Sequence, residues 1–247
     1  MLSKTYTKYI QSLHHKKYRD AHNSFIAEGS KVVIELLASG KFEAEQLLGR
    51  EAWLKENEPE LRKHYSGPIQ VIEDFELEKI SALSTPNQVV GVFKKAKQQS
   101  AVVKGKLTLA LDTIQDPGNL GTIIRIADWF GIHDIVCSQN CVELYNPKVV
   151  QSTMGSLGRV NVVYENIVNL LEQHKTIKSI AAALDGRNIK DFDKLKEAIL
   201  IIGNESKGIS TEILEMADEK ITIPKIGGAE SLNAAVAAGI ILSHIKF

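Results

Sequence analysis

The sequence predicts an α/β protein in two parts: a small mixed α/β domain, then a larger domain built on a parallel sheet. Two observations carry this prediction. The chain has 247 residues, 44% of them hydrophobic, which is enough for one large domain or two modest ones. After residue 106, short apolar runs alternate with helix-like segments, a rhythm typical of a parallel sheet covered by helices on both faces.

A polar segment, Lys94–Lys106, separates the two parts. Its sequence KKAKQQSAVVKGK contains no large apolar residues other than valines, a composition typical of linkers. We therefore assign residues 1–95 to a first domain, residues 96–106 to a linker and residues 107–247 to a second domain.

In the first domain, apolar periodicity predicts both helices and strands. The expected helices are Tyr6–Leu13, Lys31–Ala38 and Glu76–Leu83. The expected strands are Ser24–Ala27, Gln46–Leu48, Ile69–Ile72 and Gln88–Phe93. Together these elements are enough for one small domain.

In the second domain, the alternation of strands and helices is more regular. The expected strands are Leu107–Asp112, Asp134–Cys137, Val160–Val163, Ser179–Leu184, Leu200–Gly203 and Lys220–Ile223. The expected helices are Leu120–Phe130, Pro147–Thr153, Ile167–His174, Ile209–Met216 and Leu232–Ile245. Ligands of parallel sheets bind beyond the carboxyl ends of the strands. We therefore expect the chemistry in the loops after Asp112, Leu184, Gly203 and Ile223.

The charge is divided unevenly along the chain. The total is zero, but residues 1–106 carry +4 and residues 107–247 carry −4. Such asymmetry indicates an end that faces a polyanion, although a solvated helix face gives the same pattern. The candidate contacts to such a polyanion are the basic residues near the N-terminus, Lys4, Lys8, Lys16, Lys17 and Arg19.

Several functional classes lose support. No stretch approaches the ~18 consecutive apolar residues of a membrane span, and the N-terminus lacks the apolar core of a signal peptide, so we expect a reducing cytoplasm. Cys137 and Cys141 have no second pair with which to complete a tetrahedral metal site, so we expect thiols and no metal. The chain contains no G-x-G-x-x-G, G-K-[ST], H-E-x-x-H or G-x-S-x-G motif, which disfavours dehydrogenases, kinases and common hydrolases.

The first candidate loop lies within LALDTIQDPGNLGTIIRIADWFGI, residues 109–132. Pro117 and Gly118 predict a turn, and Asn119 is placed to cap the helix that follows. The start of that helix offers backbone N–H groups and a positive dipole to a phosphate. Arg125 lies one turn after Gly121, so its side chain has an open path toward the cap. A surface arginine beside an ordinary turn is the alternative interpretation.

Two further loops complete the candidate site. In GNESKG, residues 203–208, two glycines allow the backbone to approach a ligand closely, and Glu205 could cap the next helix, pair with Arg125 or touch a ligand. In the third loop, Ile223 ends a strand and Ser231 can cap a helix whose first turns, from Asn233, consist almost entirely of small residues. Such a helix favours close approach by a backbone or a flat ligand, although tight packing alone also explains it.

DPGNLGTIIR, GNES-K-G and IP-x₆-SLN, in this order, closely resemble the three motifs of the SpoU (TrmH-type) RNA 2′-O-ribose methyltransferases of the SPOUT superfamily. The resemblance covers residues 107–247, with small departures at Ile126 and Ala234. F-I-A-E-G at Phe25–Gly29 resembles the small RNA-substrate-binding domain often found ahead of that catalytic domain.

The resemblance implies a deep trefoil knot, an exception to the rule that chains avoid knots, and a homodimer joined through the catalytic domain. It also implies S-adenosyl-L-methionine as the cofactor. By this resemblance the cofactor would be held around Leu184, Gly203, Ile223 and Leu232, and the residues of methyl transfer would be Asn119, Arg125, Glu205, Ser231 and Asn233.

The expected function is thus ribose 2′-hydroxyl methylation, with ribosomal RNA of the 23S type favoured by the separate N-terminal module. One alternative is a tRNA ribose methyltransferase, since relatives of that kind use the same catalytic motifs. A second is an RNA-binding or ribosome-assembly factor that keeps the fold without the activity. A third, an enzyme acting on a small phosphorylated metabolite, lacks any phosphate-loop signature.

Overall fold

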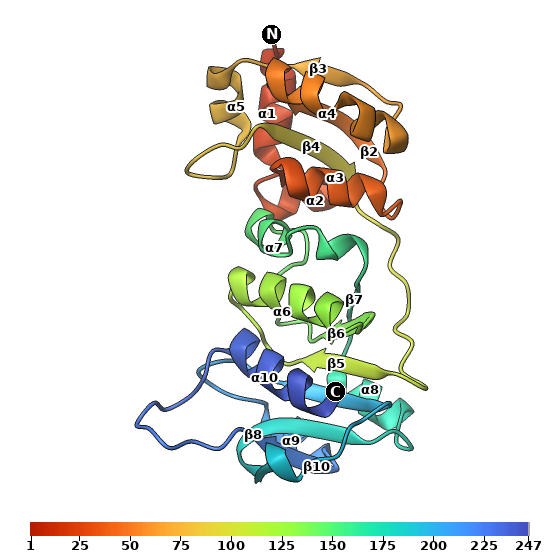
Figure 1. Ribbon diagram of the computed structural model, residues 1–247, viewed down its shortest axis with the longest axis vertical. Helices are drawn as coiled ribbons and strands as arrows, with labels where there is room; N and C mark the ends of the chain where they lie inside the picture. Colours follow the sequence, from red (N-terminus) through yellow and green to blue (C-terminus); the bar gives the residue numbers. More distant parts are fainter. Residues whose placement is uncertain (247) are drawn as a thin grey trace. The chain divides into compact units, whose positions relative to one another are not determined.

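The computed structural model describes residues 1–246 and divides them into two compact units. Unit 1 contains Met1–Lys97 together with Glu143–Arg159, and unit 2 contains Gln98–Val142 together with the chain from Val160 onward. Figure 1 shows the chain coloured along its sequence, with most helices and strands labelled.

Unit 2 is built on one sheet of six strands, and every neighbouring pair runs parallel. The strand order is β10-β8-β9-β5-β6-β7. The strands are β5 (Leu107–Leu111), β6 (Asp134–Cys137), β7 (Asn161–Tyr164), β8 (Ser179–Asn188), β9 (Ala198–Ile202) and β10 (Glu219–Thr222). The predicted fold class, a parallel α/β sheet preceded by a small mixed α/β unit, is confirmed.

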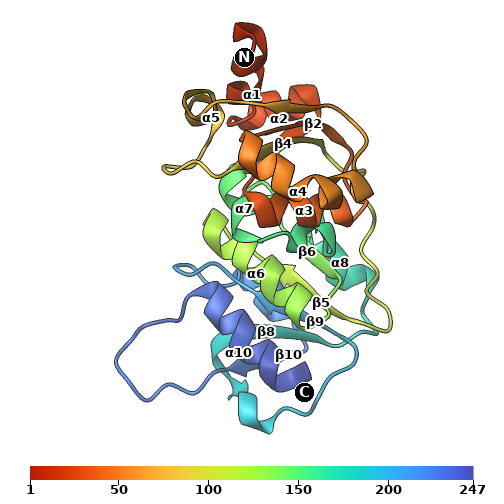
Figure 2. The ribbon, with the colours of Figure 1, turned by 45° about the horizontal axis from the view of Figure 1, so that its top comes forward.

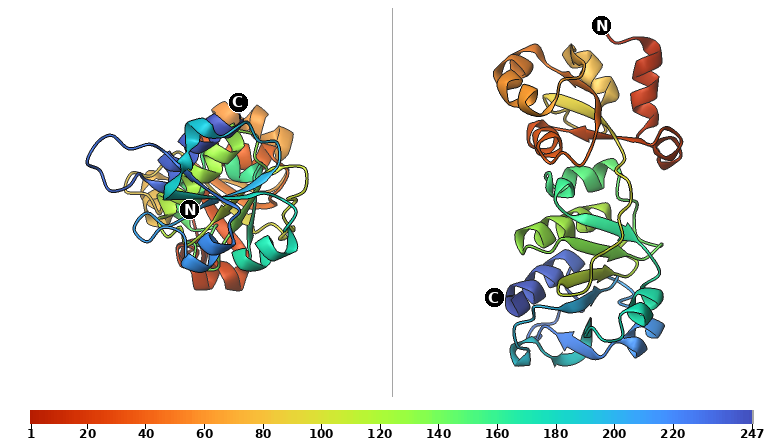
Figure 3. Two further views of the ribbon diagram at one scale, coloured as in Figure 1. Left: turned by 90° about the horizontal axis from the view of Figure 1, so that it is seen from below. Right: turned by 90° about the vertical axis from the view of Figure 1, so that its right-hand side faces the viewer.

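Helices cover both faces of this sheet (Figure 3). They are α6 (Pro117–Trp129), α8 (Ile167–Gln173), α9 (Thr211–Met216) and α10 (Ala234–Lys246), with a short 3₁₀ turn, η2 (Ile189–Asp191). Helices α6 and α10 pack against each other. Gly239 of α10 lies beside Ile126 of α6, where an added Cβ would stand 3.6 Å from the Ile126 Cδ1. A Cβ at position 239 would thus make ordinary van der Waals contact with Ile126, so this packing does not require glycine there.

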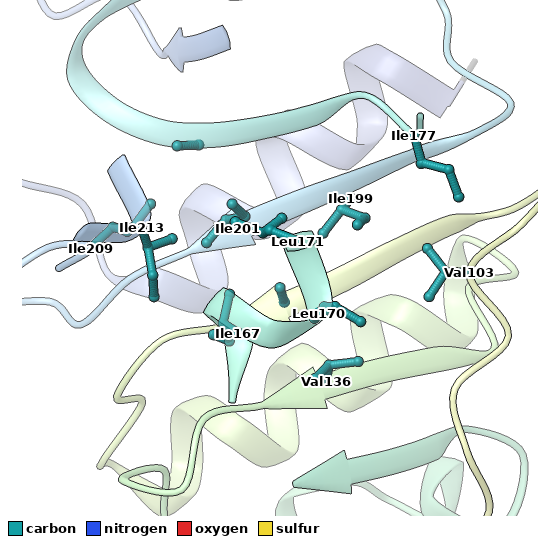
Figure 4. Close-up of a cluster of buried hydrophobic side chains, with 12 residues drawn as sticks. Val103, Val136, Ile167, Leu170, Leu171, Ile177, Ile199, Ile201, Ile209 and Ile213 are labelled. Carbon is teal, nitrogen blue, oxygen red and sulfur yellow. The ribbon is translucent and has the colours of Figure 1, made fainter. Parts of the chain in front are cut away.

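The opposite face of the sheet carries a core of aliphatic side chains, shown in Figure 4. Ile167, Leu170 and Leu171 of α8 pack on β6 and β9, where Val136 and Ile199 are fully buried. Val103 joins the same cluster and is 2% exposed. The polar segment before β5 therefore contributes one valine to the core of unit 2.

Unit 1 has a four-stranded mixed sheet of order β1-β4-β2-β3. Its strands are β1 (Ser24–Glu28), β2 (Ala44–Gly49), β3 (Ile69–Val71) and β4 (Val89–Lys94). Its helices from the N-terminal segment are α1 (Lys4–Ser12), α2 (Lys16–His22), α3 (Ser30–Ala38), α4 (Glu51–His64) and α5 (Asp74–Ile80). One aliphatic cluster joins α1 and α5 to the sheet through residues such as Ile10, Leu77 and Val92.

Helices α2 and α4 were not predicted from the sequence. Helix α4 is rich in charge and contains Pro59; its buried residues Trp53, Leu54 and Leu61 share one face, but the six residues between Leu54 and Leu61 include no aliphatic or aromatic side chain. Helix α2 buries Arg19 and no apolar residue. Apolar periodicity therefore gives no signal for either helix. Across residues 1–246, no helix has the length and apolar character needed to cross a bilayer.

A segment that follows β6 in the chain belongs to unit 1. It contains α7 (Pro147–Ser152) and a 3₁₀ turn, η1 (Ser156–Gly158). Gly155, with φ +95°, and Gly158 lie against α3, where a Cβ would overlap Glu35 and Ser39 respectively. Tyr145 adds its ring to Phe25, 4.7 Å away between centroids. This segment is therefore a packed part of unit 1.

Arg19 anchors the same segment. Its side chain is 2% exposed, and its guanidinium donates to Glu143 Oε2 from Nε at 3.1 Å and from Nη2 at 2.5 Å. Nη1 donates to the Leu13 carbonyl at 2.8 Å. The inclusion of Arg19 among the RNA contacts is therefore wrong, because its donors are committed inside the protein and it has no surface to offer a phosphate.

Candidate functional site

A cavity of about 660 Å³ opens at the carboxyl ends of β9 and β10 and beside the middle of β8 in unit 2. Three stretches form most of its wall: residues 182–184 of β8, residues 202–208 after β9, and residues 222–225 with 229–232 between β10 and α10. The sheet argument predicted ligand binding after these strands. The volume lies in the range of about 300–1,000 Å³ that is usual for small-molecule and cofactor sites.

The loop after β9, residues 203–208, has a fixed internal shape. Asn204 and Gly208 exchange backbone hydrogen bonds of 3.0 and 2.9 Å, and Asn204 Oδ1 accepts from the Ser206 and Lys207 amides at 2.9 and 3.1 Å. Gly208 has φ +71°, and a Cβ on Gly203 would overlap the Gly208 backbone. Both glycines of GNESKG are thus needed for the loop to fold back on itself.

Helix α6 begins beside this loop, and its cap differs from the prediction. The N-cap is Asp116, whose Oδ1 accepts from the Asn119 amide at 2.8 Å, and Pro117 occupies the first helical position. Asn119 is therefore the third residue of the helix rather than its cap. A proline at the first helical position favours the preceding residue as the cap, so the sequence contained the signal for Asp116.

Side-chain hydrogen bonds join the three predicted loops. Asn119 Nδ2 donates to Glu205 Oε1, and Asn119 Oδ1 accepts from Asn233 Nδ2 at 2.8 Å. Ser231 Oγ lies 3.5 Å from the Glu205 carbonyl oxygen, to which it donates. Of the roles considered for Glu205, pairing with Arg125 and capping α9 are not seen. Its carboxylate instead faces α6 at the cavity wall.

Asn233, not Ser231, caps α10. Asn233 Oδ1 accepts from the Ala235 and Val236 amides at 3.0 and 3.2 Å. The side-chain amide of Asn233 therefore makes two kinds of contact. Its oxygen accepts from backbone amides at the start of α10, and its nitrogen donates to Asn119. Sequence reasoning included Asn233 in the site and assigned the cap two residues too early.

The four predicted cofactor positions, Leu184, Gly203, Ile223 and Leu232, all line the cavity. The backbone of Leu184 is held by Thr222, whose Oγ1 donates to its carbonyl at 3.2 Å. The loop between β10 and α10 extends away from its helix, as Figure 2 shows. Leu184 and Leu232 are 78% and 45% exposed, so the cavity has an apolar rim.

Arg125 is not part of the cavity wall. Its side chain lies on the exposed side of α6, and within the described residues no hydrogen bond or ion pair holds it. Trp129, one turn later, is 84% exposed, and Val236 and Ile240 of α10 are 50% and 37% exposed. The α6–α10 pair thus presents an apolar surface with a free guanidinium beside it.

Both cysteines are buried thiols, and Cys141 contacts the turn that leads into α6. Cys141 Sγ donates to the Leu111 carbonyl at 3.2 Å and accepts from the Ile114 amide at 3.3 Å. Interaction with Cys137 lowers the pKa of Cys141 to about 7, and interaction with Cys141, together with burial, raises the pKa of Cys137. Among residues 1–246 no group of three or more histidine, cysteine or acidic side chains is arranged to hold a metal.

The remaining basic candidates lie on α1 and α2 of unit 1. Lys4, Lys8, Lys16 and Lys17 are exposed, and Lys16 pairs with Asp20 at 3.1 Å. The side chains of Lys4, Lys8 and Lys17 are available to a polyanion, in contrast to that of Arg19.

Sequence reasoning missed the residues whose hydrogen bonds hold the backbone of the cavity wall in place. Asp112 and Asn204 fix the loop after β9, and Thr222 fixes Leu184. Asp112 directly follows β5, Thr222 ends β10, and Asn204 is the second residue of GNESKG, so position was a signal for all three. Their partners lie 38–98 residues away in sequence, and no local pattern predicts such pairings.

Two family models match the chain. The SpoU rRNA Methylase family matches residues 106–243, and the MRM3-like substrate binding domain matches residues 4–91. The first match covers the cavity and all three motif loops, and the second covers most of unit 1.

Similar proteins cover nearly the whole chain. The 23S rRNA (guanosine(2553)-2′-O)-methyltransferase RlmP of Bacillus subtilis is 31% identical, over 96% of this chain and 94% of its own length. The structure of an AdoMet-bound rRNA methyltransferase from Sinorhizobium meliloti is 30% identical with a TM-score of 0.86, covering 99% of this chain and 96% of that one. The SpoU methyltransferase AviRb from Streptomyces viridochromogenes, in complex with AdoMet, is 25% identical with a TM-score of 0.85, covering 98% and 97%.

Proposed function

The chain belongs to the SpoU rRNA methylase family, and from that premise we propose that it transfers a methyl group from S-adenosylmethionine to a ribose 2′-hydroxyl of ribosomal RNA. The observation that carries the proposal is the hydrogen-bonded joining of Asn119, Glu205 and Asn233, of which Glu205 lines the cavity. These three residues come from the three motifs that the family shares.

The residues around the cavity fit S-adenosylmethionine. Ala182, Ala183 and Ile202 offer apolar contact for a flat base, and the backbone around Leu184, Gly203, Ile223 and Leu232 offers hydrogen bonds to polar groups. The close packing of Gly203 on Gly208 leaves no side chain in the cavity at this point. When bound, the cofactor supplies a methyl group activated by a sulfonium. Two solved relatives contain AdoMet, which supports the same assignment.

Arg125 is the residue we assign to the substrate. A guanidinium has a pKa above ~12, so it is a poor base at neutral pH. Its planar donors instead suit a phosphate in a bidentate contact, and its charge stabilises an oxygen that becomes negative. Arg125 would therefore clamp the phosphate beside the target ribose and stabilise the developing 2′-oxyanion. The hydroxyl proton leaves to that phosphate or to water.

Asn119, Ser231, Asn233 and Glu205 have positioning roles in this proposal. Asn119 and Ser231 would orient the 2′-hydroxyl. Glu205 and Asn233 hold the Asn119 amide from both ends, so its orientation is fixed before substrate arrives. Such preorganisation supplies much of the acceleration in a transfer whose reactants must lie in line.

RNA is the substrate class that this chemistry requires, because DNA has no 2′-hydroxyl. Two similarities support ribosomal RNA as the substrate. RlmP, a 23S rRNA enzyme, matches this chain along nearly its whole length, and unit 1 matches a substrate-binding domain. A tRNA substrate and a non-catalytic role in ribosome assembly are the alternatives that the experiment below distinguishes.

We also propose a homodimer joined through the exposed α6–α10 surface, defined by Trp129, Val236 and Ile240. A second copy of the chain would cover these apolar side chains and place Arg125 at a subunit interface. Sedimentation equilibrium measures the molecular mass in solution, and the mass of a monomer at micromolar concentration would refute the proposed dimer. We further propose that the chain of unit 2 forms a trefoil knot and that the protein is cytoplasmic.

Salt dependence tests the role of α1 and α2. Each phosphate neutralised by a lysine contributes roughly 0.7–0.9 log units of affinity per log unit of salt. Replacing both Lys4 and Lys8 by alanine is expected to reduce the salt slope of RNA binding by about 1.5 log units, measured by fluorescence anisotropy. Lys55→Ala is the control, because Lys55 is already paired with Glu51 on α4. An unchanged slope in the double variant would exclude these lysines as RNA contacts.

The proposed function is tested by incubating the protein with radiolabelled S-adenosylmethionine and separated RNA fractions. The fractions are deproteinised rRNA, ribosomal subunits and tRNA, all from a strain that lacks this protein. We expect label in rRNA or in subunits, at a single ribose 2′-oxygen found by nucleotide-resolution mapping. Label in tRNA alone would select the tRNA alternative. Cofactor binding by calorimetry without transfer to any fraction would favour the assembly factor.

A further inference from the structure

The loop of residues 203–208 is rigid in itself, so its position in the cavity depends on what holds its two ends. Its internal bonds between Asn204 and Gly208 fix its shape. They do not fix its orientation relative to β8, the segment after β10 and the helix α10, which form the remainder of the cavity. Positioning of this loop therefore has to come from outside it.

Both ends of the loop are attached to the end of β5. At the first end, Asn204 Nδ2 donates to the Thr113 carbonyl at 2.9 Å. At the far end, Asp112 Oδ2 accepts from the Ser210 amide at 2.8 Å. Asp112 also continues the pairing of β5 with β9, donating its amide to the Ile202 carbonyl at 2.9 Å. Two consecutive residues thus hold the loop on both sides.

Asp112 is a buried carboxylate that the chemistry assigned above does not use. Its side chain is 6% exposed, and its second oxygen accepts from Thr113 Oγ1 at 2.9 Å. Ser210, the N-cap of α9, makes no capping bond with its own side chain, and at that helix end the Asp112 carboxylate accepts the Ser210 amide. A carboxylate suits the positive end of a helix dipole, and its loss leaves a donor without a partner.

We propose that Asp112 is a positioning residue for cofactor binding, which fixes the loop of residues 203–208 through the Ser210 amide. The proposal rests on the proposed function, because it names what the loop is positioned to hold. Asp112 touches neither substrate nor cofactor in this assignment. Its effect is transmitted through Ser210 to the backbone around Gly203 and Glu205.

The test compares Asp112→Ala with Asp112→Asn. In the alanine variant, the dissociation constant of S-adenosylmethionine, measured by calorimetry, is expected to rise about tenfold to hundredfold, the usual cost of one hydrogen bond to a charged group. In steady-state assays KM for the cofactor rises more than kcat falls. The asparagine variant is expected to stay within about threefold of wild type, because its amide oxygen still accepts from Ser210.

A second measurement needs no cofactor. Hydrogen exchange of the backbone amides from Glu205 to Ser210 is expected to speed up at least tenfold in Asp112→Ala, and to remain near wild type in Asp112→Asn. If wild type bound no S-adenosylmethionine, the proposed function would fail, while the exchange data would still decide whether Asp112 holds this loop.

Asp134→Ala is the matched control. Asp134 is also a buried carboxylate at a strand end of the same sheet, accepting from Asn161 Nδ2 at 2.9 Å, but it lies at the amino end of β6. Its loss is expected to lower the melting temperature without changing cofactor affinity or exchange in the loop. Equal losses of affinity in Asp112→Ala and Asp134→Ala, or no gain in exchange in Asp112→Ala, would overturn the proposal.

Discussion

Replacing Arg125 by alanine is expected to lower the turnover number about 100- to 1,000-fold, the range measured when one donor to a developing oxyanion is removed. The side chain has no partner within the described residues, so its loss leaves no buried group unsatisfied, and the fold should persist. Arg125→Lys retains the charge but loses the planar pair of donors. We expect it to recover less than a tenth of the wild-type rate.

Single-turnover methylation of rRNA with saturating cofactor measures this effect. Arg187→Lys is the matched control, since Arg187 belongs to the same unit and is held by Glu219 at 3.5 Å and by the Phe192 ring. The control should leave turnover unchanged. Near-normal turnover in Arg125→Lys would reject the bidentate contact, and near-normal turnover in Arg125→Ala would remove Arg125 from the site altogether.

The sequence predicts most of unit 2 because each element there has a local cause. The strands are short apolar runs, and α6, α8 and α10 carry regular apolar faces, so pattern and structure agree within a few residues. The three site loops follow because parallel strands end at one edge of a sheet. Gly203 and Glu205 of the loop after β9 accordingly line the cavity.

What the sequence does not predict depends on distant partners. Glu143 lies 124 residues from Arg19, and the ion pair that brings residues 143–159 into unit 1 has no local signature. Arg19 itself sits among exposed lysines on α2, where charge composition is typical of a solvated face. Composition gives the net charge of a segment, but only tertiary packing shows which of its charges is buried.

Replacing Arg19 by alanine is expected to lower the free energy of unfolding of unit 1 by about 3–5 kcal/mol, because it leaves the Glu143 carboxylate without its buried partner. Glu143 is 17% exposed, and its other cation, Lys95, lies 3.9 Å away. The Leu13 carbonyl loses a donor as well. The measurement is urea denaturation followed by tryptophan emission in a Trp129→Phe background, so that the buried Trp53 of unit 1 is the one source of the signal.

Two further variants separate this ion pair from a general effect of charge. Lys17→Ala, on the same helix, should change the free energy of unfolding by no more than about 0.5 kcal/mol, as expected for an exposed side chain. The double replacement Arg19→Met with Glu143→Leu should recover most of the loss, because an apolar pair of similar volume needs no charge compensation. If Arg19→Ala unfolds like wild type but weakens RNA binding, Arg19 is a phosphate contact and its burial against Glu143 is not maintained in solution. If stability falls and the double variant restores both stability and RNA binding, the guanidinium serves unit 1 alone.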